Sequence, residues 1–155
     1  MGRGLVGQLA HRVATVLMPS APPALTAQLG NVQQSDWFAT PLKPDQLIDG
    51  APNPRSVRLA VSGDTGFVTF LWECDRGRFR WVFRSDELVH ILEGSVEIRE
   101  QDGRTYTLRA GDVAQFPLGL STEWNVTERL RKLAVHRSDV SVPDQVRERL
   151  RRLAR

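Results

Sequence analysis

The middle of the chain alternates short apolar runs with glycine-containing turns. From residue 57 to residue 136, apolar and β-branched residues are grouped between Gly, Asp and Ser, and residues 78–84 alternate arginine with aromatic or aliphatic side chains. Such short runs, without helical spacing between them, are typical of strands joined by hairpins. We predict about nine antiparallel strands in a barrel or double-sheet jelly roll. They are expected at residues 57–61, 66–73, 78–84, 87–92, 95–100, 104–109, 112–116, 122–126 and 130–136.

The two ends of the chain have a different pattern. Apolar residues recur at helical spacing within residues 5–17, and a Pro- and Ala-rich stretch follows up to residue 34. Near the other end, Pro143 precedes apolar residues that share one helical face. We therefore predict an N-terminal extension over residues 1–35 (a short helix and a linker), a β-domain over 36–140 and a C-terminal helix over 141–155.

Composition favours a cytoplasmic protein that binds neither membranes nor nucleic acids. The chain has no run near the roughly 20 apolar residues that a membrane span needs. Its one cysteine, Cys74, excludes an internal disulfide and is expected to be a buried thiol. The acid-free residues 1–35 leave a secretory signal or a transit peptide as alternatives, but His11 and Arg12 interrupt the apolar stretch. The arginines near the C-terminus lack interleaved aromatic residues, so we interpret them as a solvated helix face.

Two motifs in the predicted strands carry a family resemblance. The first is Glu87-x-x-His90-Ile-Leu-Glu-Gly94, and the second is Gly111-Asp112-x4-Pro117-x-Gly119. Together they resemble the two conserved motifs of the cupin superfamily. The residues around Trp72, Trp124 and Lys132 are similar to those of one branch of this superfamily, the small single-domain cupins grouped with (S)-ureidoglycine aminohydrolase and ethanolamine-utilisation protein Q. The resemblance implies an all-β double-stranded β-helix, or jelly-roll barrel.

The resemblance also implies a metal site that this sequence cannot build in the usual way. Metal-binding cupins place two histidines and a glutamate in the first motif and a third histidine after the second. Here the glutamate is Glu87, whereas the histidine positions fall within residues 80–83 and at Thr122, and none of them is histidine. We predict no metal cofactor. The alternative is an atypical Mn, Fe or Zn site with Glu87 and His90, which needs a β-bulge because an odd separation along a strand points two side chains to opposite faces.

The remaining polar and aromatic residues suggest a binding pocket in the barrel. We expect it to be lined by Trp72, Arg80, Glu87, Trp124 and Lys132, with Glu87 paired to Arg80 or Lys132 because a carboxylate in an apolar pocket needs a partner. A buried ion pair without any ligand would have the same sequence pattern. His136, at the end of the last predicted strand, is expected to face solvent.

Two functions therefore remain open. The first is a cupin that binds a small polar or anionic metabolite without the usual metal. The second is an enzyme of ureide or carbohydrate metabolism, a hydrolase or isomerase, with an atypical metal site or with Glu87 as general base. The fold cannot decide between them, because one fold hosts many chemistries. We also expect a homodimer, since the predicted N-terminal helix has an apolar stripe that a monomer would leave exposed.

Overall fold

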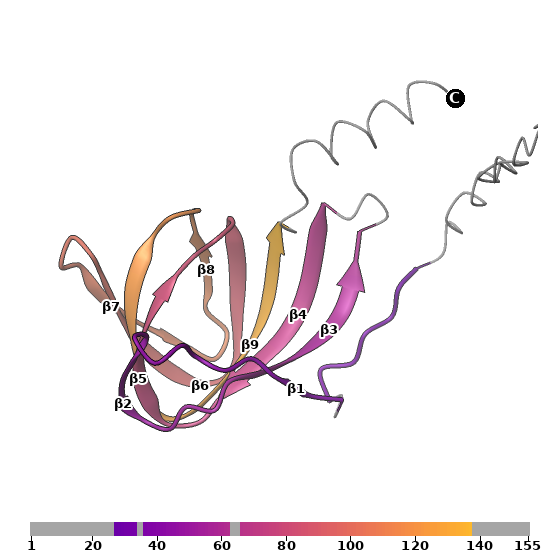
Figure 1. The fold of residues 1–155 in the computed structure, drawn as a ribbon. Helices are drawn as coiled ribbons and strands as arrows, with labels where there is room; N and C mark the ends of the chain where they lie inside the picture. The colour runs from indigo at the N-terminus through magenta and orange to yellow at the C-terminus, as the bar shows by residue number, and fades with distance from the viewer. Residues whose placement is uncertain (1–26, 34–35, 63–65, 138–155) are drawn as a thin grey trace, which may run out of the picture.

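Nine strands make up the part of the chain that the structure, a computed structural model, describes: residues 27–33, 36–62 and 66–137. All nine join one strongly curled sheet (Figure 1). The strands are β1 (Phe38–Ala39), β2 (Leu47–Gly50), β3 (Arg55–Val61), β4 (Phe67–Cys74), β5 (Gly77–Val82), β6 (Glu87–Glu100), β7 (Thr105–Arg109), β8 (Val113–Phe116) and β9 (Ser121–Arg137). This confirms the predicted all-β barrel. The helices predicted at the two ends fall outside the described residues.

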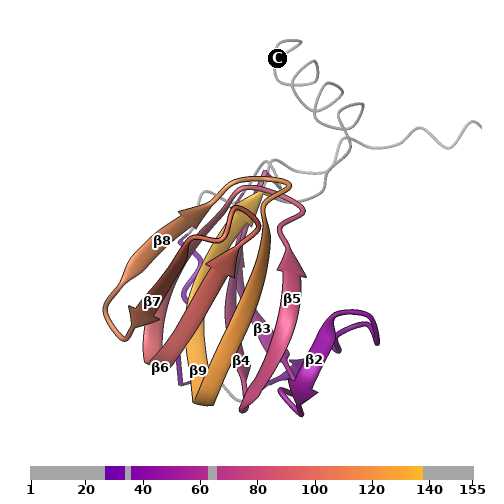
Figure 2. The ribbon, with the colours of Figure 1, turned by 90° about the vertical axis from the view of Figure 1, so that its left-hand side faces the viewer.

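The long strands β6 and β9 connect the two halves of the curled sheet. They run side by side (Figure 2), and every pairing between strands is antiparallel. Along one edge of β9, the C-terminal part pairs with β4, which pairs with β3, and the N-terminal part pairs with β5. The other edge of β9 pairs with β6, which pairs in turn with β7 and β8. Four of the predicted strands are therefore halves of longer ones: 87–92 and 95–100 join in β6, and 122–126 and 130–136 join in β9.

Gly94 explains why β6 can bend instead of ending at the predicted turn. Its φ is +79°, which only glycine adopts without strain, and a Cβ at this position would overlap the carbonyl oxygen of Arg129 on β9. The register between β6 and β9 shifts on both sides of this point, as expected for bulges that curve a sheet. The sequence predicts a hairpin turn at Gly94, whereas the structure has a bend there within one continuous strand.

Aromatic and aliphatic side chains fill the inside of the barrel. Along β5, Phe79 is buried while Arg78 and Arg80 are exposed, so the predicted alternation of an aromatic and an arginine face is confirmed. Cys74 is buried in the same core, as predicted. The other buried members of the core are Trp72, Phe83, Val89, Ile91, Val96, Ile98, Leu108, Phe116, Trp124, Val126 and Leu130.

A buried carboxylate fixes the segment before β1 to the outside of the barrel. The side chain of Glu73 is only 1% exposed, and it forms ion pairs with Arg55, Arg129 and Arg131. The guanidinium groups of Arg55 and Arg131 each lie 5.6 Å from the ring centre of Trp37, within the range of cation–π attraction. Trp37 is thereby positioned one residue before β1. No helix in the described ranges is long and apolar enough to cross a membrane.

Candidate functional site

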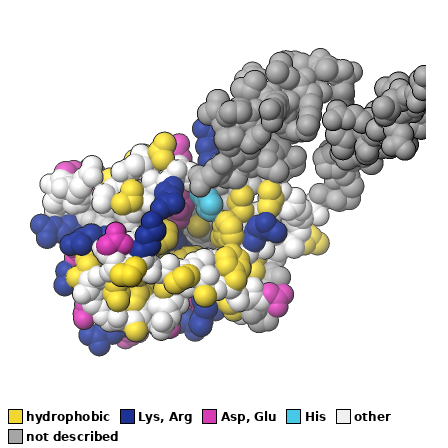
Figure 3. All heavy atoms as spheres, viewed as in Figure 1, with side chains coloured by type: hydrophobic (Ala, Val, Ile, Leu, Met, Phe, Trp, Pro, Cys, Tyr) yellow, Lys and Arg dark blue, Asp and Glu magenta, His cyan; other side chains and the backbone are white. Residues whose placement is uncertain are grey.

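A cavity of about 230 Å³ lies beside the core, where β1, β3, β4, β5, β6 and β9 come together. Its volume corresponds to about seven or eight water molecules, enough for a small metabolite. The space-filling view shows hydrophobic side chains around a hollow in the described surface (Figure 3). The residues that line the cavity are Phe38, Thr40, Ser56, Phe70, Trp72, Trp81, Glu87, Lys132, Ala134 and His136.

The strand register brings these side chains together. On β9, Lys132, Ala134 and His136 are two residues apart, so they share one face of the strand. Pairing places Trp72 of β4 opposite Lys132, and it places Glu87 of β6 opposite His136. β1 closes the cavity with Phe38, whose ring meets that of Phe70 edge to face, and its neighbour Thr40 is held by a backbone hydrogen bond to Pro54.

The charged pair in this cavity is Glu87 with Lys132. The Lys132 Nζ atom lies 2.8 Å from Glu87 Oε1, and the two side chains are 5% and 12% exposed. Nζ also lies 5.0 Å from the ring centre of Trp72 and 4.9 Å from that of Trp124. One carboxylate and two aromatic faces therefore surround the ammonium group, which compensates for its removal from water. Of the two partners that we considered for Glu87, the structure selects Lys132.

Trp124 packs against the ammonium group of Lys132 from the core side of the cavity. It is buried in the core, and its indole N–H donates a hydrogen bond to the hydroxyl of Thr122, 2.9 Å away. The Thr122 hydroxyl in turn donates to the backbone oxygen of Trp81, at 3.1 Å. Trp124 thus contacts Lys132 without lining the cavity, whereas Trp81, which we did not predict, is part of the cavity wall.

The structure does not bring Arg80 and His90 to the cavity. Arg80 is exposed on β5, opposite Glu123 on the outer side of the barrel. The pairing of β6 with β8 and β9 is regular from Glu87 to Ile91, with Glu87, Val89 and Ile91 facing inward. His90 therefore points to the opposite side from Glu87, and the bulge that the alternative metal site needs is not present between them.

Three further polar residues line the cavity without having been predicted from the sequence: His136, Thr40 and the buried Ser56 of β3. His136 is half-buried rather than exposed, and its ring stacks on Phe70 with 5.1 Å between the ring centres. His136 is four residues after Lys132 on the same strand, and this even separation predicts that both side chains lie on one face. Thr40 comes from a proline-rich stretch in which no strand pattern is visible, so no sequence signal placed it here.

The side chains around Glu87 do not fit a cupin metal centre. The positions where the resemblance implies imidazoles, residues 80–83 and 122, contain Arg80, aromatic and aliphatic residues, and Thr122, whose hydroxyl is already hydrogen-bonded. The carboxylate of Glu87 is paired with an ammonium group. Across residues 27–33, 36–62 and 66–137, no cluster of three or more His, Cys, Asp or Glu side chains could hold a metal ion. A divalent cation needs several such ligands to offset its dehydration.

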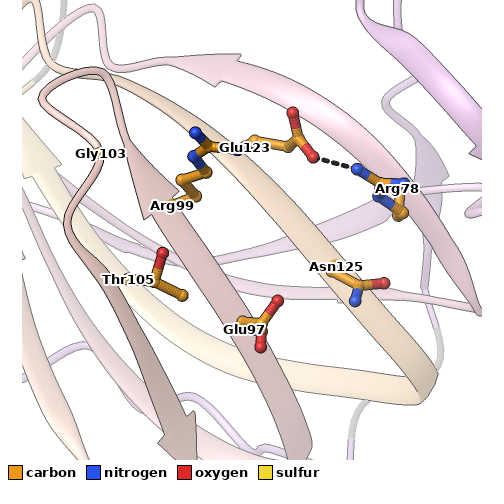
Figure 4. A pocket seen from close by; sticks show the side chains of 7 residues that line it. All are labelled: Arg78, Glu97, Arg99, Gly103, Thr105, Glu123 and Asn125. Atoms are coloured by element: carbon orange, nitrogen blue, oxygen red, sulfur yellow. Dashed lines mark hydrogen bonds and ion pairs between the residues drawn. The ribbon is translucent and has the colours of Figure 1, made fainter.

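A second, wider depression lies on the outer face of β5, β6, β7 and β9. It has a volume of about 570 Å³, and its lining is polar (Figure 4). An ion pair between Arg78 and Glu123 crosses it from β5 to β9. The remaining lining residues are Glu97, Arg99, Gly103, Thr105 and Asn125. Charges of both signs alternate here, as on an ordinary solvated sheet face.

The curled antiparallel sheet has the architecture that the cupin resemblance implies. Residues 61–134 match the family of EutQ-like cupin domains. This match confirms the resemblance that the two sequence motifs carry.

Comparison with known proteins agrees with this assignment. The chain is 34% identical over 92 residues to the acetate kinase EutQ of Escherichia coli (strain K12), covering 57% of this chain and 39% of that protein. It thus spans about two fifths of the length of that relative. The EutQ protein of Clostridium difficile has a similar fold, with a TM-score of 0.53, 17% identity, and coverage of 66% of this chain and 83% of the other. A Pseudomonas syringae protein of unknown function reaches a TM-score of 0.61 at 21% identity, covering 67% and 45%.

Proposed function

We propose that this cupin domain binds a small polar metabolite in the cavity beside Glu87, without a metal ion. The observation that carries the proposal is the Glu87–Lys132 pair within an aromatic-walled cavity. The resemblance to metal-binding cupins implies a metal-binding carboxylate at Glu87, and in this chain the ammonium group of Lys132 supplies the positive charge next to it. A concave, mostly apolar pocket with a few convergent polar groups is the usual form of a small-molecule site.

The charge of the cavity favours a polar ligand over a strongly anionic one. Glu87 and Lys132 neutralise each other, and Arg80, on which our expectation of an anion partly rested, is exposed on the outside. An anion entering the cavity would approach the Glu87 carboxylate as closely as the ammonium of Lys132. Flat side chains such as Trp72 and Trp81 can instead hold an apolar or planar part of the ligand by contact.

The proposal is tested by finding a ligand and by mapping where it binds. Small molecules released from the purified protein by denaturation would be identified by mass spectrometry, and they would be added back while the melting temperature is measured. We expect a ligand that raises the melting temperature of the unchanged protein and of a Thr107→Val control on the outer face of β7. Replacing Trp81 by Ala should abolish the shift, because it removes a wall of the cavity. Equal shifts in all three proteins would contradict the proposal.

A second candidate function is catalysis, favoured by one observation. Glu87 and His136 are opposite each other on β6 and β9, and both line the cavity. A carboxylate and an imidazole in one pocket could act as general base and general acid on a bound substrate. The two functions differ in what happens to the ligand: a binding protein returns it unchanged, whereas an enzyme of the hydrolase or isomerase type converts it during prolonged incubation.

We also propose that the protein is a homodimer. On the outer face of the sheet, Leu88 is 43% exposed and Val113 is 61% exposed. The half-buried Leu133 and Val135 lie in the same region, because they pair with β6 next to Leu88. A contiguous apolar patch of this kind is a common site of protein association. Light scattering should give twice the mass of the 17.4 kDa chain, and a Leu88→Lys variant should give a monomer. A monomer for the unchanged protein would contradict this proposal.

A further inference from the structure

Three residues that line the cavity, Glu87, His136 and Thr40, each have an atom that can accept a hydrogen bond from a ligand. This inference rests on the proposed binding function, and it concerns the chemistry of the ligand. Lys132 is the obvious donor, but its ammonium group is directed to Glu87 Oε1 and to the faces of Trp72 and Trp124. It is also almost fully buried. The other carboxylate oxygen of Glu87, Oε2, makes no hydrogen bond or ion pair with any residue that the structure describes.

His136 contributes a second acceptor. Its Nδ1 atom lies 3.1 Å from the backbone oxygen of Arg137. A carbonyl oxygen can only accept, so this hydrogen bond requires that Nδ1 carry the hydrogen. In the neutral imidazole, the proton on Nδ1 leaves Nε2 with a lone pair. Stacking on Phe70 fixes the plane of the ring at the cavity wall.

Thr40 contributes the third polar atom. Its hydroxyl oxygen is buried in the cavity wall and has no hydrogen-bond partner among the described residues. An unsatisfied buried hydroxyl costs about 1–3 kcal/mol. Buried polar groups are otherwise nearly always paired, so a group left unpaired in a binding cavity points to a partner supplied by the ligand.

We propose that the ligand is a small nitrogen compound that donates N–H hydrogen bonds to this cavity, as an amine, amidine or amide does, and that carboxylates and phosphates bind more weakly. Glu87 Oε2, His136 Nε2 and Thr40 Oγ1 accept from it, while the aromatic walls hold its apolar or planar part. A carboxylate or phosphate can accept from the Thr40 hydroxyl, but it leaves Glu87 Oε2 and His136 Nε2 unpaired and meets the Glu87 carboxylate at close range.

The test compares three probes that share one ring and differ in the polar group: benzamidine, benzamide and benzoate. Binding would be measured by NMR titration of the uniformly ¹⁵N-labelled full chain, following the indole N–H signals of Trp72 and Trp81 and the imidazole signals of His136. We expect benzamidine and benzamide to shift these signals. Benzoate should bind at least about tenfold more weakly, because it cannot donate the charge-assisted hydrogen bond to the Glu87 carboxylate.

Variants separate ligand recognition from structure. Thr40→Val keeps the shape of the side chain but removes the hydroxyl, so it should weaken benzamide binding by about five- to tenfold while leaving the stability of the free protein unchanged or raised. Thr107→Val, on the outer face of β7, is the matched control and should bind benzamide like the unchanged protein. Equal benzamide affinity in the Thr40→Val variant would overturn the inference.

The probe series also distinguishes the failure of this inference from the failure of the proposed function. Benzoate binding as tightly as benzamide, with the same cavity signals moving, would overturn the donor inference and leave the proposed binding function in place. If none of the three probes moved the cavity signals at millimolar concentration, both would be wrong.

Discussion

Lys132 Nζ and Glu87 Oε1 lie 2.8 Å apart in the cavity wall, and together they form an ion pair that is almost completely removed from solvent. The resemblance to metal-binding cupins implies a metal-binding glutamate at this position of the sequence. Here Lys132 of β9 supplies the positive charge that neutralises the Glu87 carboxylate. The pair therefore has a structural role, and its removal should have a measurable cost.

Replacing Glu87 by Gln should destabilise the protein by about 3–5 kcal/mol, because the ammonium of Lys132 would remain buried without a countercharge. Urea denaturation of the two proteins at pH 7 would measure the difference. The double variant Glu87→Leu with Lys132→Met is the control, since removing both charges together is often neutral. A loss below about 1 kcal/mol for Glu87→Gln would show that solvent reaches the pair, as for an ordinary surface ion pair.

Glu73 should make stability depend on acid pH. Burial by itself would raise the pKa of Glu73, but hydrogen bonds from Arg129, Arg131 and Arg55 outweigh it and hold the pKa below its ordinary value. A carboxyl group with a lowered pKa in the folded state stabilises the protein fully above its unfolded pKa, about 4.3, and loses this contribution as pH falls through the folded pKa.

The Glu73→Gln variant should therefore be less stable than the unchanged protein at pH 7, by about 3 kcal/mol. The difference should narrow below about pH 4, because the unchanged protein then loses the same contribution. Denaturation curves from pH 7 to pH 3 would show this. A difference that stays constant over the whole range would mean that Glu73 does not titrate with a lowered pKa.

Gly94 should tolerate no side chain. A Cβ there would overlap the carbonyl oxygen of Arg129, and the φ of +79° disfavours any other residue, so Gly94→Ala should unfold the domain or prevent its soluble expression. Gly103 is the matched control: its φ is +90°, but a Cβ would meet nothing within 4 Å. Gly103→Ala should cost only about 1–2 kcal/mol. Similar losses in both variants would show that the contact with Arg129 does not matter.

Cys74 should be inert toward thiol reagents in the folded protein. Burial raises the pKa of its thiol to about 12, even though Lys132 nearby favours the thiolate. Since the thiolate is the reactive form, a chromogenic disulfide reagent at pH 8 should modify Cys74 only after denaturant is added. Stoichiometric reaction within minutes in native buffer would contradict the buried placement.

The fold was predictable because its signals are local. Alternation along residues 78–84, repeated glycine turns and two motifs were enough for an all-β cupin barrel. The continuity of β6 and β9 was not predictable, because a glycine at a bulge and a glycine at a hairpin turn look alike until the partner strand is known. In this chain, the close approach of Arg129 to Gly94 marks the difference.

The site was predictable only where strand alternation or motif spacing determined it. Glu87, Trp72 and Lys132 line the cavity, and each faces inward on a strand with a clear pattern. Arg80 was misplaced although its alternation with Phe79 and Trp81 had already put it on the outer face. Thr40 and Phe38 depend on β1, which pairs with β3 over two residues only, and such a short pairing has no sequence period.

The metal content of the purified protein shows whether Glu87 belongs to a metal centre. Elemental analysis should find much less than one Mn, Fe, Ni, Cu or Zn ion per chain, and EDTA should leave the melting temperature unchanged, because Lys132 already compensates the charge of Glu87. About one transition metal per chain, lost in the Glu87→Gln variant and accompanied by a large fall in melting temperature on chelation, would contradict this prediction.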